Sequence, residues 1–235
     1  MSMTKFANPS AVLTPERGWS VVTGAALIVM AVAGAIAYGY AHPLLHMAND
    51  AQATAAAVEG RPILLAMVVL SWSLVALLDF LASCGIYLVF RRSAPLLSLL
   101  VAAIRVVYTL VLIAAVAELG SLLFNEYSVS GLVKFDSFEK IWSGGLIVFG
   151  LHLLALSRLV SVVGFPSLLV ATFLGLGGLG YVFVKGTDFL GLEGLTVPLV
   201  VEVSAGIPMV FGELLFAIAL LVGAAAPGKA SSDIR

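Results

Sequence analysis

The sequence predicts an all-α fold, a polytopic bundle of six transmembrane helices with both termini in the cytoplasm. Hydrophobic residues make up 61% of the 235 residues and charged residues only 11%, whereas a soluble globular chain has roughly 25% charged residues. The charges gather in short clusters. The stretches between them are apolar for about 20 residues or more, which is long enough to cross a hydrocarbon core roughly 30 Å thick.

The boundaries of the predicted spans follow the length of each apolar run. The spans cover residues 19–40, 62–90, 94–124, 141–163, 166–184 and 198–226. The first resembles a signal peptide, but its apolar run is longer than the roughly 7–15 residues of a signal h-region, so we expect it to be retained. The chain is then one transmembrane domain, 19–226, between short cytoplasmic tails, 1–18 and 227–235.

The connections between the spans are short, so no separate soluble domain is expected. The loop over residues 41–61 has room for a short interfacial helix over 51–58, and further loops are predicted at 125–140 and 185–197. Lysine and arginine set the orientation, because they gather on the cytoplasmic side. The clearest local signal is Arg91-Arg92 in the tight turn between the second and third spans. The sequence thus predicts a multi-pass protein of the cell inner membrane, in contact with membrane lipid.

Several classes of function find no support in the composition. The net charge of −1 gives no reason to expect a nucleic-acid partner. The single cysteine, Cys84, excludes a disulfide framework and a multi-cysteine metal site. His42 and His46 are four residues apart, with Pro43 between them and no evident third ligand, so we interpret them as interfacial histidines. Neither a metal nor a cofactor is expected.

The segment Gly175–Gly180 matches the dinucleotide-binding fingerprint in its glycine spacing. That fingerprint needs a preceding strand and a helix N-terminus that faces solvent, whereas these glycines lie inside an apolar span. Close packing between helices is therefore the better interpretation.

Four ionisable residues lie deep in the predicted spans, where a charge costs at least a few kcal/mol. Asp79 is 12 residues before Arg91 and Arg105 is 12 residues after Ser93. His152 and Glu213 lie 12 and 13 residues before Gly164 and Ala226, the cytoplasmic ends of their spans. At 1.5 Å per helical residue, each lies roughly 18 Å from the cytoplasmic end. The four residues therefore share one layer, and Asp79 and Arg105 are expected to meet because their helices are antiparallel neighbours.

This layer is the candidate binding site, and Tyr108, three residues after Arg105, is placed to hydrogen-bond into it. With His152 neutral, two carboxylates face one guanidinium, so either His152 or one carboxyl holds a proton. Three hypotheses remain open. A protein that binds or moves a small molecule or a proton needs a water-accessible cavity there, and a structural or regulatory protein acting through lipid or a partner needs a sealed, fully paired cluster. An intramembrane enzyme acting on lipid needs a lateral opening.

The chain resembles a bacterial integral-membrane family catalogued as domain of unknown function 4386, over residues 19–223. The segments that carry the resemblance are Leu77-Leu78-Asp79, Ala102-Ala103-Ile104-Arg105-Val106-Val107, Phe149-Gly150-Leu151-His152-Leu153-Leu154 and Gly212-Glu213-Leu214. The resemblance implies a compact helical membrane protein and no particular substrate. The segments that carry the resemblance contain the same four ionisable residues that lie in one layer of the predicted spans. The sequence sets no oligomeric state.

Overall fold

The computed structural model describes residues 14–124, 130–164, 168–190 and 199–223, apart from the side chains of 130, 188, 199–206 and 209. The described residues form helices and connecting turns, without strands. The α-helices are α1 (Pro15–Gly34), α2 (Ala51–Gly60), α3 (Pro62–Phe90), α4 (Pro95–Ser121), α5 (Ser130–Val162), α6 (Leu168–Phe189) and α7 (Leu199–Val222). The first helix continues through a π-helical turn, Ala35–Ala41, into a short 3₁₀ turn, His42–Leu44.

Most predicted boundaries agree with these helices. The second span has the same bounds as α3, and the interfacial helix predicted at 51–58 is α2. Prolines stand at the first positions of α1, α3 and α4, where the missing N–H group costs no helical hydrogen bond. The predicted tails fall almost wholly outside the described residues, and α1 already begins at Pro15.

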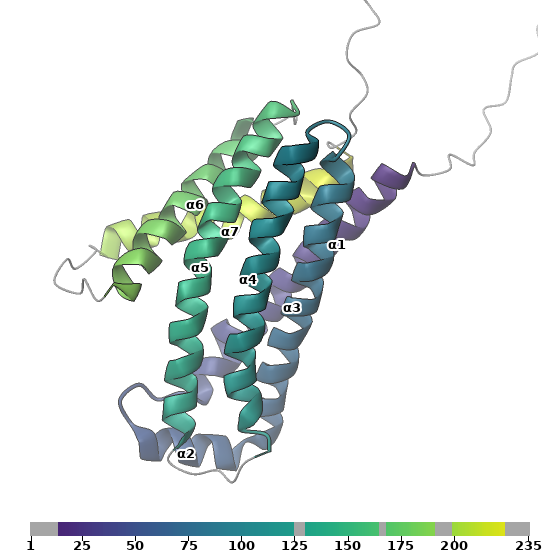
Figure 1. Cartoon of the computed structure of the whole chain (residues 1–235). Helices are drawn as coiled ribbons and strands as arrows, with labels where there is room; N and C mark the ends of the chain where they lie inside the picture. Colours follow the sequence, from purple (N-terminus) through teal and green to yellow (C-terminus); the bar gives the residue numbers. More distant parts are fainter. Residues whose placement is uncertain (1–13, 125–129, 165–167, 191–198, 224–235) are drawn as a thin grey trace, which may run out of the picture.

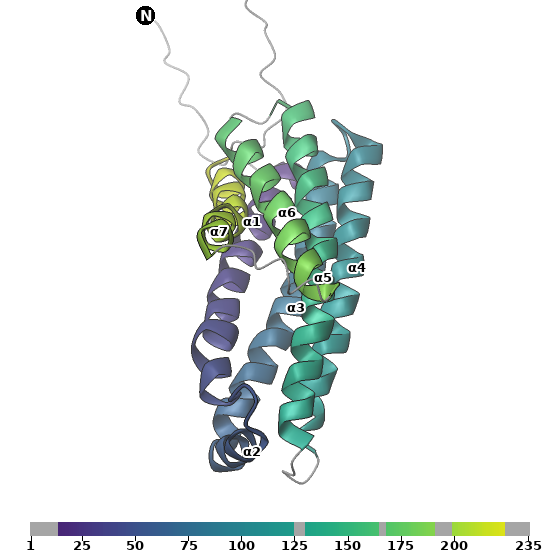
Figure 2. The ribbon, with the colours of Figure 1, turned by 90° about the vertical axis from the view of Figure 1, so that its left-hand side faces the viewer.

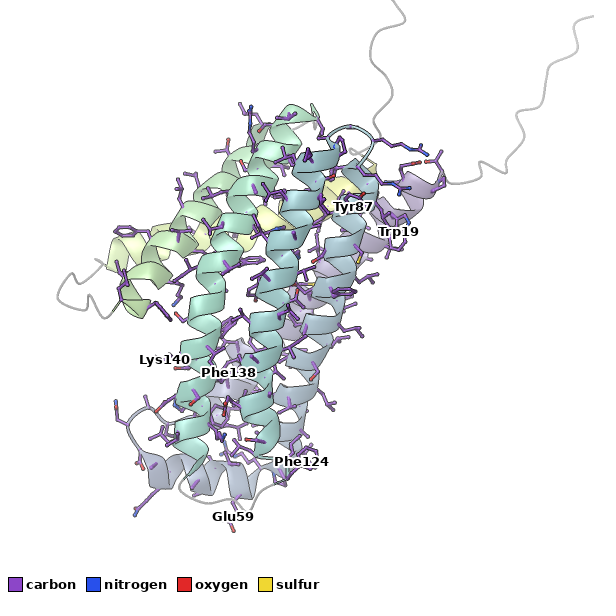
Figure 3. All side chains as sticks on the ribbon, viewed as in Figure 1. Trp19, Glu59, Tyr87, Phe124, Phe138 and Lys140 are labelled. Carbon is purple, nitrogen blue, oxygen red and sulfur yellow. The ribbon has the colours of Figure 1, made fainter. Side chains whose placement is uncertain are left out.

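The predicted loop at 125–140 is wrong from residue 130 onward, because α5 begins at Ser130. Charged residues interrupt the apolar run in this stretch and hide the helix from a search for apolar length. The buried residues Phe135 and Phe138, three positions apart, reveal one apolar face of the helix instead. Figure 3 shows Phe138 between α5 and α4, with Lys140 on the outer side of α5. Likewise, α6 extends to Phe189, so residues 185–189 belong to a helix and not to the predicted loop.

The six long helices form a closed ring. Each of α3, α4, α5 and α6 packs against the next long helix along the chain, α1 packs against α3, and α7 packs against α1. Figure 1 shows α2 lying across one end of the bundle, and Figure 2 shows α7 beside α1. Helices far apart in the sequence thus become neighbours where the ring closes.

The outer surface of the ring is apolar. Large side chains such as Leu77 on α3 and Leu110 on α4 are 66% and 61% exposed, which is the reverse of a soluble bundle and fits a lipid environment. Within the described residues, five helices have the length and composition to cross a membrane: Pro15–Leu44, Pro62–Phe90, Pro95–Ser121, Gly131–Val162 and Leu168–Thr187. These helices indicate a membrane protein.

The ends of the first and last helices are tied together. The guanidinium of Arg17 donates to the carbonyl oxygens of Leu220 and Leu221 at 2.8 and 2.5 Å, and Ser20 Oγ donates to Leu220 O at 2.7 Å. A cation at this position satisfies carbonyls that have no partner within the helix and complements the helix dipole. The N-terminal end of α1 and the C-terminal end of α7 therefore lie on the same side of the bundle.

Glycines let α5 and α6 approach closely. A Cβ atom built on Gly178 would lie 2.7 Å from Gly150 O, and one built on Gly150 would lie 2.8 Å from Gly178 O. This contact confirms the interpretation of the 175–180 segment as a packing surface, since small residues are what allow helix backbones to meet in a membrane.

We expect Gly178→Ala to destabilise the protein by about 1–3 kcal/mol, because the added methyl group forces α5 and α6 apart. Gly186→Ala is the matched control on the same helix, since its Cβ would meet no atom within 4 Å. Alanine there removes the backbone freedom of glycine and should be neutral or stabilising by about 0.5–1 kcal/mol. Reversible unfolding in mixed detergent micelles measures both, and equal stabilities would contradict the close contact.

Candidate functional site

Four polar side chains from four helices meet inside the bundle. Arg105 Nη2 on α4 lies 2.6 Å from Asp79 Oδ1 on α3. Arg105 Nη1 lies 2.6 Å from Glu213 Oε1 on α7 and 3.0 Å from His152 Nε2 on α5. We call these four residues the Arg105 cluster. The guanidinium of Arg105 is therefore the centre of the cluster, and each of its three partners lies on a different helix.

The tight turn between α3 and α4 explains how Asp79 and Arg105 meet. Arg91 N and Ala94 N are hydrogen-bonded to the last carbonyls of α3, so α4 turns back at once beside α3. Residues at equal distances from such a turn lie side by side, because both helices rise by the same amount per residue. The ion pair confirms the predicted contact, and Asp79, Arg105 and His152 are all fully buried.

His152 is held in one tautomer. Its Nδ1 lies 3.0 Å from Val101 O, and because a carbonyl only accepts, Nδ1 must carry the ring proton. Nε2 is then a lone pair that accepts from Arg105 Nη1. An imidazolium could not accept this bond, so the geometry corresponds to a neutral His152.

Thr109 fixes the carboxylate of Asp79. Its hydroxyl donates to Asp79 Oδ2, while Ser83 Oγ donates to Asp79 O at 2.8 Å. Thr109 is not among the site residues predicted from the sequence. The available signal was its position four residues after Arg105, which puts both side chains on the same face of α4.

The guanidinium is not fully satisfied by hydrogen bonds. Arg105 Nε is buried with no partner in the described part of the chain, and the contact between Nη2 and Asp79 Oδ1 is close but not aligned for a hydrogen bond. The guanidinium carbon also lies 5.4 Å from the centre of the Phe149 ring, within the range of a cation–π interaction. The contact with Asp79 is therefore a charge attraction without an aligned hydrogen bond, whereas Nη1 makes the aligned bonds.

Tyr108 points elsewhere than predicted. Its hydroxyl accepts a long hydrogen bond of 3.4 Å from Trp142 Nε1, and its ring packs 4.8 Å from that of Phe149. Among the described residues, the Tyr108 hydroxyl bonds to Trp142, so Tyr108 lines the packing around the Arg105 cluster without donating into it. Its partners Trp142 and Phe149 both lie on α5, and the Tyr108 ring packs against that helix.

Glu213 is the open member of the cluster. Its side chain is 21% exposed, whereas those of Asp79 and Arg105 are not exposed. Pro208 lies five residues earlier inside α7, where it leaves one carbonyl of the preceding turn without its helical partner. Next to Glu213, a Cβ on Gly212 would lie 3.1 Å from Phe173 O of α6. Glu213 thus lies on a helix that packs closely against α6 at Gly212 and lacks one backbone hydrogen bond at Pro208.

An apolar groove of about 390 Å³ runs along α3 and α4 on the outside of the bundle. Thr109 lines it from α4 and links it to Asp79, and Ser73 lines it from α3. Ser73 Oγ donates to Val69 O at 2.7 Å, so its hydroxyl is engaged within its own helix. The lining offers apolar surface and two engaged hydroxyls, without an acid, a base or an activated nucleophile among its residues.

The model of the family described as Domain of unknown function (DUF4386) matches residues 22–223. The chain belongs to this family. The matched residues include every member of the Arg105 cluster, so the cluster is part of the DUF4386 domain itself. No curated protein and no solved structure matches the chain.

We expect Arg105→Leu to destabilise the DUF4386 domain by about 3–5 kcal/mol, because it leaves the carboxylate of Asp79 buried without a counter-charge. The double variant Asp79→Leu/Arg105→Leu should be more stable than Arg105→Leu. Arg92→Leu is the control, since the Arg92 side chain is 68% exposed and its ion pair with Glu16 contributes at most about 1 kcal/mol. The free energies of unfolding in detergent test this pairing. A double variant that is no more stable than Arg105→Leu would disprove it.

We expect Thr109→Val to cost about 1–3 kcal/mol, because it leaves Asp79 Oδ2 without its donor at nearly constant side-chain volume. Thr187→Val on α6 provides the comparison, since its hydroxyl contacts only carbonyls of its own helix. The same unfolding assay reads both variants. Equal effects of the two substitutions would mean that the bond to Asp79 contributes nothing.

Proposed function

We propose that this DUF4386 protein spans the bacterial inner membrane six times, with both termini in the cytoplasm. The tie between Arg17 and the end of α7 supports an even number of crossings, because it puts both ends of the ring on one side. The described apolar part of α7, Val210–Val222, is short, but the helix itself begins at Leu199. Arg91 and Arg92 support a cytoplasmic location for that side.

Within this frame the protein binds a proton at the Arg105 cluster, and Glu213 is the residue that takes it up and releases it. The observation that carries this proposal is the charge count. Two carboxylates contact Arg105, and it is the only cation that contacts them in the described residues. The neutral tautomer of His152 leaves that count unchanged. A surplus negative charge in an apolar interior needs a proton or another cation to balance it.

The choice between the two carboxylates rests on their surroundings. Asp79 accepts from Thr109 and lies against Arg105 in a fully buried site, an arrangement that suits a permanent ion pair. Glu213 has one described polar contact, with Arg105 Nη1, and part of its side chain is exposed. A proton can therefore reach Glu213 without opening the pair between α3 and α4.

Protonation of Glu213 would change how α7 is held. A neutral carboxyl loses most of its attraction to Arg105, whose charge Asp79 still balances. Pro208 removes one helical hydrogen bond within two turns of Glu213, so α7 bends there at lower cost than an uninterrupted helix. The proposed role is thus to couple proton binding to a displacement of α7, as a protein that moves a proton or a small molecule needs.

The rival hypotheses receive less support. A purely structural cluster would be sealed and fully paired, but Glu213 is partly exposed and Arg105 Nε has no partner in the described part of the chain. A lipid-acting enzyme would place a reactive group at a lateral opening. The groove along α3 and α4 has no acid, base or activated nucleophile among its lining residues, and His152 is buried with both ring nitrogens engaged.

Labelling with dicyclohexylcarbodiimide tests the proposal, because this apolar reagent reacts with protonated carboxyls in apolar surroundings. We expect proteoliposomes containing the protein to be labelled at Glu213, and peptide mass mapping to show it. Glu213→Gln should abolish this labelling. Glu118→Gln is the matched control, since Glu118 is a partly exposed carboxylate paired with Lys134 at 2.6 Å, and it should leave the labelling unchanged.

The position of the label distinguishes the proposed site, Glu213, from the alternatives. A label on Asp79 in place of Glu213 would move the proton to the buried pair and contradict the proposed role of α7. Absence of label at every pH in a correctly folded sample would mean that no carboxyl of the cluster is protonated and accessible, and the structural hypothesis would then lead.

A further inference from the structure

A second polar cluster lies at the far end of the first helix, where the π-helical turn leads into His42. His42 Nε2 lies 2.9 Å from Glu139 Oε1 of α5, and His46 Nδ1 lies 3.5 Å from the same oxygen. One ligand atom from each of the three residues lies within 4.8 Å of the others. Two imidazole nitrogens and a carboxylate oxygen thus converge, beside a π-helical turn of the kind that recurs at functional sites.

The spacing of these atoms suits a small divalent metal ion. Zinc binds histidine nitrogen and carboxylate oxygen at about 2.0–2.2 Å in tetrahedral geometry, which sets neighbouring ligand atoms roughly 3.3 Å apart. The two distances from Glu139 Oε1, 2.9 and 3.5 Å, lie on either side of this value. The three ligand atoms all lie within 4.8 Å of one another, so side-chain shifts that bring the two histidine nitrogens to a similar separation would place all three around one ion.

Asp136 gives an independent indication of a metal site. His46 Nε2 lies 3.0 Å from Asp136 Oδ1, so Nε2 carries the ring proton when His46 is neutral, and Nδ1 directs its lone pair toward Glu139. A histidine that donates its other N–H group to a carboxylate is the usual arrangement around protein-bound zinc, because that bond fixes the tautomer and the ring orientation.

The two imidazoles are held firmly in place. The ring of His46 stacks on Phe135 at 5.3 Å with an interplanar angle of 7°, and the ring of His42 lies 5.1 Å from the same phenyl group. Just after His46, the backbone N–H and carbonyl of Met47 both bond to Thr54 Oγ1 of α2, at 3.0 and 3.1 Å. The short helix α2 thus fixes the segment that carries both histidines.

The charge and the exposure of the cluster also suit a divalent cation. Two neutral imidazoles and the carboxylates of Asp136 and Glu139 carry a charge of −2 together, which one divalent ion balances. The side chains of His42 and His46 are 5% and 8% exposed, while those of Glu139 and Asp136 are 39% and 58% exposed, so an ion can enter from water on the carboxylate side. A mixed nitrogen and oxygen donor set favours zinc over calcium or magnesium.

We infer that His42, His46 and Glu139 form a zinc-binding site, with Asp136 as the residue that orients His46. The inference is independent of the proton proposed at Glu213, since it rests on other residues at the end of the bundle that carries α2. The site requires the helical start of α5, because residues 130–140 bring Glu139 and Asp136 to the histidines.

Metal binding by the full chain in detergent, purified without a polyhistidine tag and stripped with a chelator, tests the inference. Zn²⁺ is added by equilibrium dialysis and quantified by plasma mass spectrometry, and Co²⁺ is added separately as a visible probe of geometry. We expect one Zn²⁺ per chain and the absorption of tetrahedral Co²⁺. Loss of a ligand in Glu139→Gln or His46→Gln should weaken binding by roughly 100-fold or more, and Asp136→Asn by roughly 10–100-fold.

Glu59→Gln is the matched control, because it removes an exposed carboxylate from α2 at the same end of the bundle and should leave binding unchanged. If the wild-type chain holds no more Zn²⁺ than Glu139→Gln, the cluster is only a hydrogen-bonded contact between histidines and carboxylates. Equal losses in Glu59→Gln and Glu139→Gln would mean non-specific surface binding. Should a histidine variant fail to fold, Glu139→Gln and Asp136→Asn decide, because their side chains are partly exposed.

Discussion

A guanidinium buried in an apolar interior constrains how α3, α4, α5 and α7 pack. Desolvating such a charge costs several kcal/mol unless its partners are placed well. Arg105 draws one partner from each of three other helices, so a slip of any helix by one turn, about 5.4 Å, would remove a partner. Close packing alone would not fix the helix positions so firmly, because apolar faces tolerate sliding. The relative register of α3, α4, α5 and α7 thus depends on one side chain.

The closure of the ring at α7 depends on two attachments of different strength. At its end, α7 is held by Arg17 and Ser20, which bond to backbone carbonyls and involve no titratable partner on α7. Near its middle it is held by Glu213, whose attraction to Arg105 depends on ionisation. A change in the second attachment would leave the first in place, so α7 would pivot about its end instead of separating. Pro208, on the far side of Glu213 from that end, is where such a movement costs least.

The sequence predicts the cluster better than its surroundings. Helical rise is constant and the turn at Arg91-Arg92 is short, so equal spacing places Asp79 beside Arg105 without any knowledge of packing. The early start of α5 is missed because its first turns are amphipathic, with Phe135 and Phe138 inward and charges outward. The orientation of Tyr108 depends on a partner, Trp142, that lies on another helix. The contact of Glu139 with His42 is likewise tertiary, so spacing along the chain gives no sign of it.

The two polar clusters differ in what they can accept. Three members of the Arg105 cluster are fully buried, and one of them is a cation. An ion that balances the proposed surplus charge therefore has to be small enough to enter past Glu213 and to need no new ligands. A proton meets that requirement, because it binds to a single oxygen. The cluster of His42, His46 and Glu139 offers lone pairs without a resident cation and opens to water through its carboxylates. It can supply the several ligands that a dehydrated metal ion needs, which separates the two sites by chemistry as well as by position.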